Sequence, residues 1–233
     1  MTLLNIIQRA CDRAGLPRPN AVVSATDPTV RMLLELANEE GDALSLVGDW
    51  QALRREGTFT SLASETQTAM VPTDLSRFVD ETFWNRSARR AFFGPISSAD
   101  WAAIKGGLTT SPVVDTFTLR GGDILINPAP GAGQTFAFEY IRSGWCTDNI
   151  GATYRTAWGA DSDLPVLDER LHILGIVWRF KQKRGLDWSS DYALYEDRVK
   201  RALAYEKPHR TLDMSLSERR PPGVVVPSGD WAV

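Results

Sequence analysis

The sequence predicts an α+β protein: a helical bundle formed by both chain ends, an inserted β-rich domain of antiparallel strands, and an extended C-terminal tail. Apolar residues recur at helical spacing near both ends, and between them short β-prone runs alternate with Gly, Pro, Asn and Ser. After Lys207 no apolar period is sustained. We therefore assign residues 1–49 and 163–207 to the helical domain, 50–162 to the β-rich domain and 208–233 to the tail.

Two helices are predicted before the β-rich region. Apolar residues spaced three and four apart predict the first over residues 2–15, where a glycine closes it. Thr26 or Asp27 can cap the second, because short polar side chains accept hydrogen bonds from the first free amides of a helix. Pro28 suits its first position, and it should end near Gly48.

The β-rich region contains several short predicted elements. The runs EGTFTSLA and TQTAMVP predict two strands that pair with each other, and SADWAAIKGG predicts a short helix capped by Ser97 or Ser98. The run QTFAFEYIRSGW alternates aromatic residues with others, which predicts a strand with one buried face.

A glycine-rich stretch between two β-prone runs, TLRGGDILINPAPGAGQTFAF, could hold a phosphate. A P-loop requires lysine where this chain has Gln134 and glycine where it has Pro128, and the later glycines lead into a strand rather than a helix. We therefore interpret Gly121 and Gly122 as a hairpin turn, and residues 128–133 as a loop joining two antiparallel strands.

Two further helices are predicted after the β-rich region. The segment LPVLDERLHILGIVWRFKQKRG carries an apolar stripe and is closed by Gly185, and DWSSDYALYEDRVKRALAYEK ends before Pro208. A short link favours an antiparallel pair. The tail that follows, HRTLDMSLSERRPPGVVVPSGDWAV, lacks the apolar pattern to build a core of its own, so its apolar residues need a partner.

Composition narrows the function. The net charge is −3, from 29 acidic and 26 basic residues, so no general basic excess indicates nucleic-acid binding. We find neither a membrane-spanning run nor a signal peptide. Two distant cysteines favour reduced thiols over a disulfide framework, and with two histidines in all we expect no metal site and no cofactor.

No catalytic constellation is apparent, so we predict that the protein is not an enzyme. His172 follows Asp168 and Glu169 by about one helical turn, a spacing that we interpret as pairing on a helix surface. The alternative is a small hydrolase or ligand-binding enzyme whose site lies between the helical and β-rich parts and uses acids such as Asp123 and Glu139. A pocket in which carboxylates converge would favour that alternative.

The run WRFKQKRG is basic and aromatic. Short basic runs are usually solvated or paired with acids, but this one could also line a channel through which DNA passes. Its candidate channel-lining residues are Arg179, Lys181, Lys183 and Arg184.

The order of elements and several phrases resemble the head-to-tail adaptor proteins of tailed bacteriophages, also called neck, gatekeeper or tail accessory proteins. The matching phrases are LLNIIQRACDRAGL, MVPTDLSRFVDETFWN, FTLRGGDILINPAPGAGQTFAFEYIRSGW and LDERLHILGIVWRFKQKRGLDWSSDYALYEDRVKRAL. In such proteins a Leu-Pro-x-Asp-like turn leads into a strand that carries aromatics, and this chain has Val71-Pro72-Thr73-Asp74. The resemblance extends to about Lys207.

This resemblance implies a structural protein of the virion neck, assembled in the host cytoplasm as a ring of twelve subunits that docks on the portal and binds tail or nozzle proteins. Double-stranded DNA would pass transiently through the central channel during ejection, and no membrane is involved. Such proteins commonly reach into the portal with the C-terminal segment. The resemblance therefore implies portal-docking roles for Arg219, Arg220, Val225 and Trp231. Another tail or minor capsid component of the virion remains an alternative.

Overall fold

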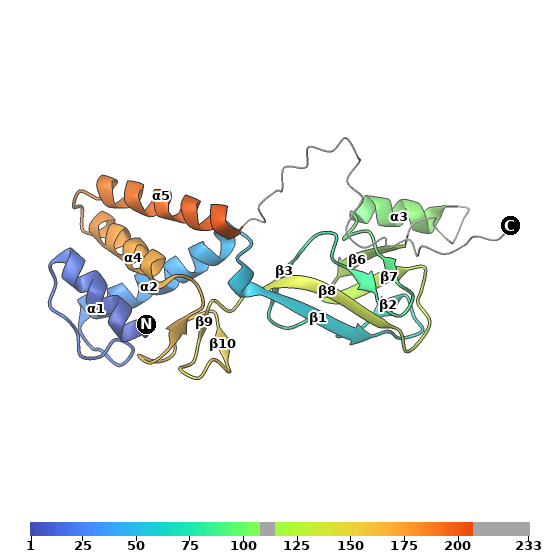
Figure 1. Ribbon diagram of the computed structural model, residues 1–233, viewed down its shortest axis with the longest axis horizontal. Coiled ribbons are helices and arrows are strands. Elements are labelled where there is room, and N and C mark those ends of the chain that lie inside the picture. The colour runs from blue at the N-terminus through green and yellow to red at the C-terminus, as the bar shows by residue number, and fades with distance from the viewer. Residues whose placement is uncertain (108–114, 207–233) are drawn as a thin grey trace, which may run out of the picture.

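The computed structural model describes residues 1–107 and 115–206, which form a helical part and a β-rich part side by side along the longest axis (Figure 1). The predicted α+β class is confirmed, because helices combine with antiparallel sheets. Over the described residues, none of the helices has the length and apolar character needed to span a bilayer.

The helical part is built around one central helix. It contains α1 (Leu3–Ala14), α2 (Pro28–Val47), α4 (Glu169–Lys183) and α5 (Ser189–Glu206), and α4 contacts each of the other three. The predicted starts of the first two helices are confirmed, since Thr2 caps α1 and Asp27 caps α2 with Pro28 behind it. Because α4 is covered on several sides, most of its side chains are buried.

The β-rich part contains two antiparallel sheets. The larger sheet contains β1 (Arg54–Thr60), β3 (Leu75–Phe78), β4 (Trp84–Asn85), β5 (Arg90–Ala91) and β8 (Thr135–Arg142); the smaller contains β2 (Thr66–Gln67), β6 (Thr116–Arg120) and β7 (Asp123–Asn127). The helix α3 (Ser98–Gly106) lies beside the smaller sheet (Figure 1), capped by Ser97 as predicted. A short 3₁₀ turn, η1 (Gln51–Leu53), leads from α2 into β1.

Aromatic side chains form the core between these sheets. Phe83 is almost fully buried, and its ring stacks on Phe117 with the centroids 4.2 Å apart and on Phe138 with the centroids 5.6 Å apart. Phe59 stacks on Phe136 in the same cluster at 5.2 Å. Aromatic side chains bury large apolar areas, and stacked or tilted ring pairs add a favourable contact of their own.

Three expectations about the strands are wrong. The two runs predicted to pair with each other have different partners, since β1 pairs with β8 and β2 pairs with β7. The loop 128–133 joins strands of different sheets. Strand β8 is buried on both faces, not one, since successive residues such as Phe136, Ala137 and Phe138, whose side chains alternate between the faces, are all buried. The hairpin turn at Gly121 and Gly122 is confirmed, and both glycines have positive φ.

The segment between β8 and α4 packs against the helices. It carries β9 (Cys146–Thr147), β10 (Tyr154–Arg155) and β11 (Leu164–Pro165), which form a third small sheet. Trp145 and Trp158 from this segment are buried in the same apolar cluster as α1, α2 and α4. A Cβ at Gly41 of α2 would lie 2.5 Å from the Trp145 ring, so the indole lies directly on that helix backbone.

Candidate interaction surfaces

A buried ion pair joins α2 to α4. The Glu40 side chain is fully buried and accepts a hydrogen bond from Arg179 Nε at 2.8 Å. Burial raises the pKa of Glu40 above its usual value, although the nearby guanidinium opposes this shift. Because Arg179 is committed to Glu40, the pair acts as a clamp between two helices rather than as a reactive site.

His172 is not on a helix surface, as the sequence suggested, but in the core. Its ring packs beside both Trp145 and Trp158, with centroid separations of 6.0 Å and 5.9 Å. Within the described residues neither ring nitrogen has a hydrogen-bond partner. Desolvation lowers the pKa of His172 to about 4, so the ring is neutral at physiological pH. The central position of α4, which the local sequence does not reveal, explains this difference.

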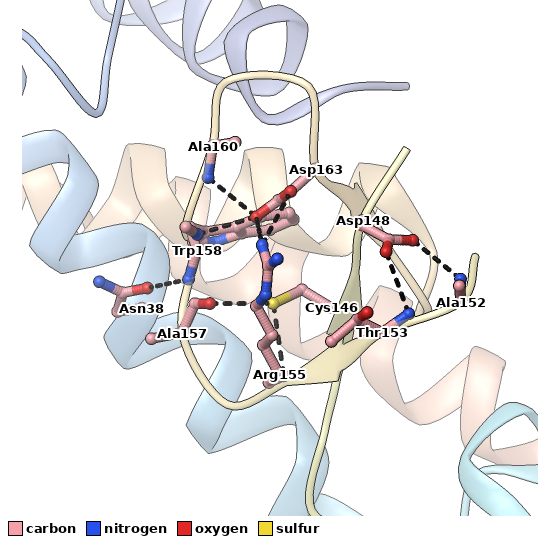
Figure 2. A network of polar contacts seen from close by, with 11 residues as sticks. Asn38, Cys146, Asp148, Ala152, Thr153, Arg155, Ala157, Trp158, Ala160 and Asp163 are labelled. Carbon is pink, nitrogen blue, oxygen red and sulfur yellow. Dashed lines mark hydrogen bonds and ion pairs between the residues drawn. The ribbon is translucent and has the colours of Figure 1, made fainter. Parts of the chain in front are cut away.

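The two cysteines are buried, free thiols. Cys146 donates to the backbone carbonyls of Arg155 and Ala157, each at 3.3 Å (Figure 2). Burial raises the pKa of Cys146 to about 12 and also raises the pKa of Cys11. Neither thiol is therefore ionised at neutral pH, and an uncharged thiol is a poor nucleophile.

A carboxylate network fixes the segment that carries Cys146 (Figure 2). Asp163 is 1% exposed, and it accepts hydrogen bonds from the amides of Gly159 and Ala160 at 2.8 and 2.9 Å and from Arg155 Nη1 at 3.1 Å. Its own carbonyl accepts from the amide of Leu3 in α1. The network thus holds the segment against the first helix.

The acids of the alternative enzyme hypothesis lie in different sheets. Asp123 of β7 accepts from the amide of Ala69 at 3.1 Å, whereas Glu139 of β8 forms an ion pair with Arg54 at 3.4 Å. In the residues that the structure describes, no group of three or more His, Cys, Asp and Glu side chains is arranged to hold a metal ion. The geometry therefore does not bring these acids to a common pocket.

The four basic residues predicted to line a channel lie on the last two turns of α4 and just after them. Lys181 forms an ion pair with Asp191 at 2.5 Å, and Lys183 with Glu39 at 3.1 Å. Arg179 pairs with Glu40, as described above, and the guanidinium of Arg184 lies over the ring of Phe180, 5.6 Å from its centroid. Lys183 and Arg184 are the exposed members of the set.

The residues predicted to dock on a portal, Arg219, Arg220, Val225 and Trp231, lie outside the described residues. The described chain reaches Glu206 at the end of α5, where Glu206 contacts the junction between the two parts. Its carboxylate accepts from the amide of Gln51 at 2.8 Å, and its carbonyl accepts from the Gln51 side chain at 3.0 Å. The C-terminal segment therefore starts at this junction.

An arginine-lined groove lies between α1, α4 and α5, and the sequence did not predict it. We call it the arginine groove; its volume is about 450 Å³, and Ile173, Leu174 and Leu194 provide its apolar lining. The polar lining consists of Arg9, Arg13, Asp12, Arg170 and Arg198. Over the described part of the chain none of these four arginines forms an ion pair within 4 Å, and the one acid, Asp12, pairs with Arg18. In the sequence, only the four-residue spacing of Arg9 and Arg13, which places both on one face of α1, indicates this groove.

A second surface lies on the β-rich part. Phe93 is 64% exposed, and it lines a hollow with Phe92, Pro95 and Ile96, to which the acids Asp80, Glu81 and Asp100 also contribute. An exposed apolar patch with a polar rim is typical of a protein-binding surface.

Comparison with known proteins gives one family description. Residues 1–225 match the family model described as SU10 adaptor protein, a match that includes the helical part and the β-rich part. The comparison with curated proteins found no match to this chain.

Proposed function

Because this chain belongs to the SU10 adaptor protein family, a family of phage head-to-tail adaptors, we propose that it forms a ring of twelve subunits in the virion neck. The ring docks on the portal, binds tail or nozzle proteins and leaves a central channel for double-stranded DNA. The observation that carries this proposal is the extent of the match, residues 1–225. Assembly takes place in the host cytoplasm, before the tail is joined.

The portal contact is made by the C-terminal segment in this proposal. Arg219, Arg220, Val225 and Trp231 supply two cations and two apolar side chains, a combination that suits an interface with an apolar centre and a charged rim. The place where the segment starts supports this role. Since Glu206 is tied to Gln51, the segment leaves each subunit at the junction of its two parts.

The tail-facing contact is made by the β-rich part. The apolar hollow at Phe93 supports this assignment, because the exposed ring and the acids around it offer a partner both apolar area and charge. Within the basic run, Lys183 and Arg184 are the residues that we assign to the DNA channel, since their side chains are exposed, whereas Arg179 and Lys181 are partly buried in ion pairs with acids of α2 and α5.

The test is electron microscopy of the purified protein mixed with the portal protein of the same phage. We expect a ring of this chain on one face of the portal. A variant lacking residues 208–233 should keep the circular dichroism and unfolding transition of the full chain but lose portal binding. A full-length chain that never associates with portal rings would contradict the proposal, whereas a free monomer alone would not, since partner binding can drive assembly.

A further inference from the structure

The arginine groove lies on one face of α4, and α2 lies on the opposite face. Arg170, Ile173 and Leu174 line the groove, whereas Gly175 and Arg179 contact Glu40 of α2. At 100° per residue these two sets point in opposite directions from the helix axis. Figure 1 agrees, since α2 runs behind α4 where α1 and α5 flank it.

The outer face of α2 carries an acidic stripe. Glu35, Glu39 and Asp42 are exposed and lie at spacings of four and three residues, so they share one side of the helix, away from Glu40. Leu46 follows one turn later and is 69% exposed. Two contacts modify the stripe: Lys183 pairs with Glu39, and Asp42 accepts from the indole of Trp145. Arg31 lies one turn before it.

The groove and the stripe are complementary in charge and in apolar content. The groove has four arginines against one acid, and the stripe has three acids. Leu194 is 46% exposed at the groove, and Leu46 is exposed at the end of the stripe. Guanidinium groups pair well with carboxylates, and apolar side chains beside such a contact add buried area to it.

We infer that the acidic stripe of one copy of this chain docks into the arginine groove of a second copy. The two surfaces lie on opposite sides of the helical part, so the contact is heterologous: each subunit offers its groove to one neighbour and its stripe to the other. Repetition of such a contact closes into a ring when the rotation between subunits permits it. This inference rests on the proposed function, and it names the surfaces that would hold neighbouring subunits together.

Nucleic acid is the competing occupant of the groove, because arginines also bind phosphates. The acidic stripe on α2 favours a second copy, since a DNA site would not need a matching acidic surface on the far side of the same helices. The two occupants also respond differently when the charges of the groove are reversed. Reversing the charges of α2 as well would restore a contact between copies, but it would not restore the binding of nucleic acid.

The experiment uses full-length chains with exchanged charges. The groove variant is Arg170→Glu with Arg198→Glu, and the stripe variant is Glu35→Arg with Glu39→Arg. Self-association is measured by sedimentation velocity at low ionic strength, where ion pairs are least screened, and ring formation is measured by electron microscopy with portal. We expect each variant alone to associate more weakly than the unmodified chain by at least about tenfold, because like charges then face each other.

The two variants mixed together should associate again, and so should the chain that carries all four changes. A control variant, Lys200→Glu with Arg120→Glu, shifts the net charge like the groove variant but alters the outer side of α5 and the β6–β7 turn; it should associate like the unmodified chain. If the groove variant forms portal rings as readily as the unmodified chain, the inference is overturned while the proposed function stands. The groove is a nucleic-acid site, and the inference is wrong, if the groove variant loses DNA binding and association is restored neither in the mixture of the two variants nor in the chain with all four substitutions.

Discussion

Glu40 of α2 lies directly against the backbone of Gly175 in α4: a Cβ added at Gly175 would be 2.0 Å from the carboxylate carbon of Glu40. No real Cβ contact is that short, so either the side chain or a helix would have to move. The approach lets Arg179, one turn later on α4, reach the same carboxylate. The two central helices are thus held together by a contact that only glycine permits.

Gly175→Ala should therefore destabilise the protein by about 3 kcal/mol, since overpacking a dense core forces side chains and helices out of place. The measurement is the free energy of unfolding in urea. Gly106→Ala is the matched control, because a Cβ there meets no atom of the described residues within 4 Å and alanine is the better helix former. Equal effects of the two substitutions would contradict the role given to Gly175.

The stability of the protein should fall as the pH falls from about 6.5 toward 4, because of His172. Its pKa in the folded state, about 4, is below the ordinary value of 6.5. In this pH window the unfolded chain therefore binds a proton that the folded chain does not. The free energy of unfolding falls by about 3 kcal/mol by the time the pH reaches 4. His172→Leu should remove this dependence and leave the stability near pH 7 unchanged or higher, since neither ring nitrogen has a hydrogen-bond partner among the described residues. Unfolding curves at several pH values measure the slope.

Glu40 should make stability depend on pH in the opposite direction from His172. Burial raises its pKa in the folded state, so its contribution is greatest below the ordinary value of 4.5 and is lost as the pH rises through the folded pKa. Glu40→Gln should remove that loss, whereas His172→Leu should not affect it. If both substitutions change the pH slope in the same direction, one of the two assignments is wrong.

Replacement of Asp163 should loosen the segment between β8 and α4. Asp163→Ala leaves the amides of Gly159 and Ala160 without an acceptor, and we expect a loss of about 3 kcal/mol. Asp148→Ala is the control, because that carboxylate also accepts from two amides, of Ala152 and Thr153, but in an exposed turn where water can replace it. Its effect on the urea midpoint should be clearly smaller.

Thiol labelling should report opening of the core. Cys11 and Cys146 are buried, and burial raises the pKa of both, so neither presents a thiolate to a reagent in the folded state. A maleimide or an aromatic disulfide should label them only as fast as the protein opens, and labelling should become complete in denaturant. Rapid labelling of the native protein at neutral pH would show that the helical core is less closed than described.

Elements with local signals were predictable. Asp27 before Pro28 marks the start of α2, and Gly15, with φ of +69°, marks the end of α1, because each residue has a conformational reason to occupy that position. The β6–β7 hairpin was equally local, since its turn lies between strands that pair with each other. Such features depend on a few neighbouring residues, and a single sequence contains them.

Features that depend on distant segments were not predictable. Strand β1 pairs with β8, and Arg54 lies opposite Ile141 in this pair. No short-range pattern in the sequence identifies β8 as the partner of β1. His172 has the spacing of a surface residue, yet α4 is covered by three helices and by the tryptophans of another segment. The arginine groove combines residues from α1, α4 and α5, so it exists only after the helices have packed.

Within the described residues the chain passes between the two parts twice, through η1 into β1 and from β8 into the segment that carries Trp145. Arg54, at the start of β1, lies in register with Ile141 near the end of β8, and β8 runs on into the buried Trp145. Backbone hydrogen bonds join β1 to β8 along the seven residues of β1, so the two connections are held to each other where they leave the β-rich part. A pull on the β-rich part therefore reaches α2 along two routes at once, through the residues before β1 and through β8 into the packing of Trp145 on Gly41.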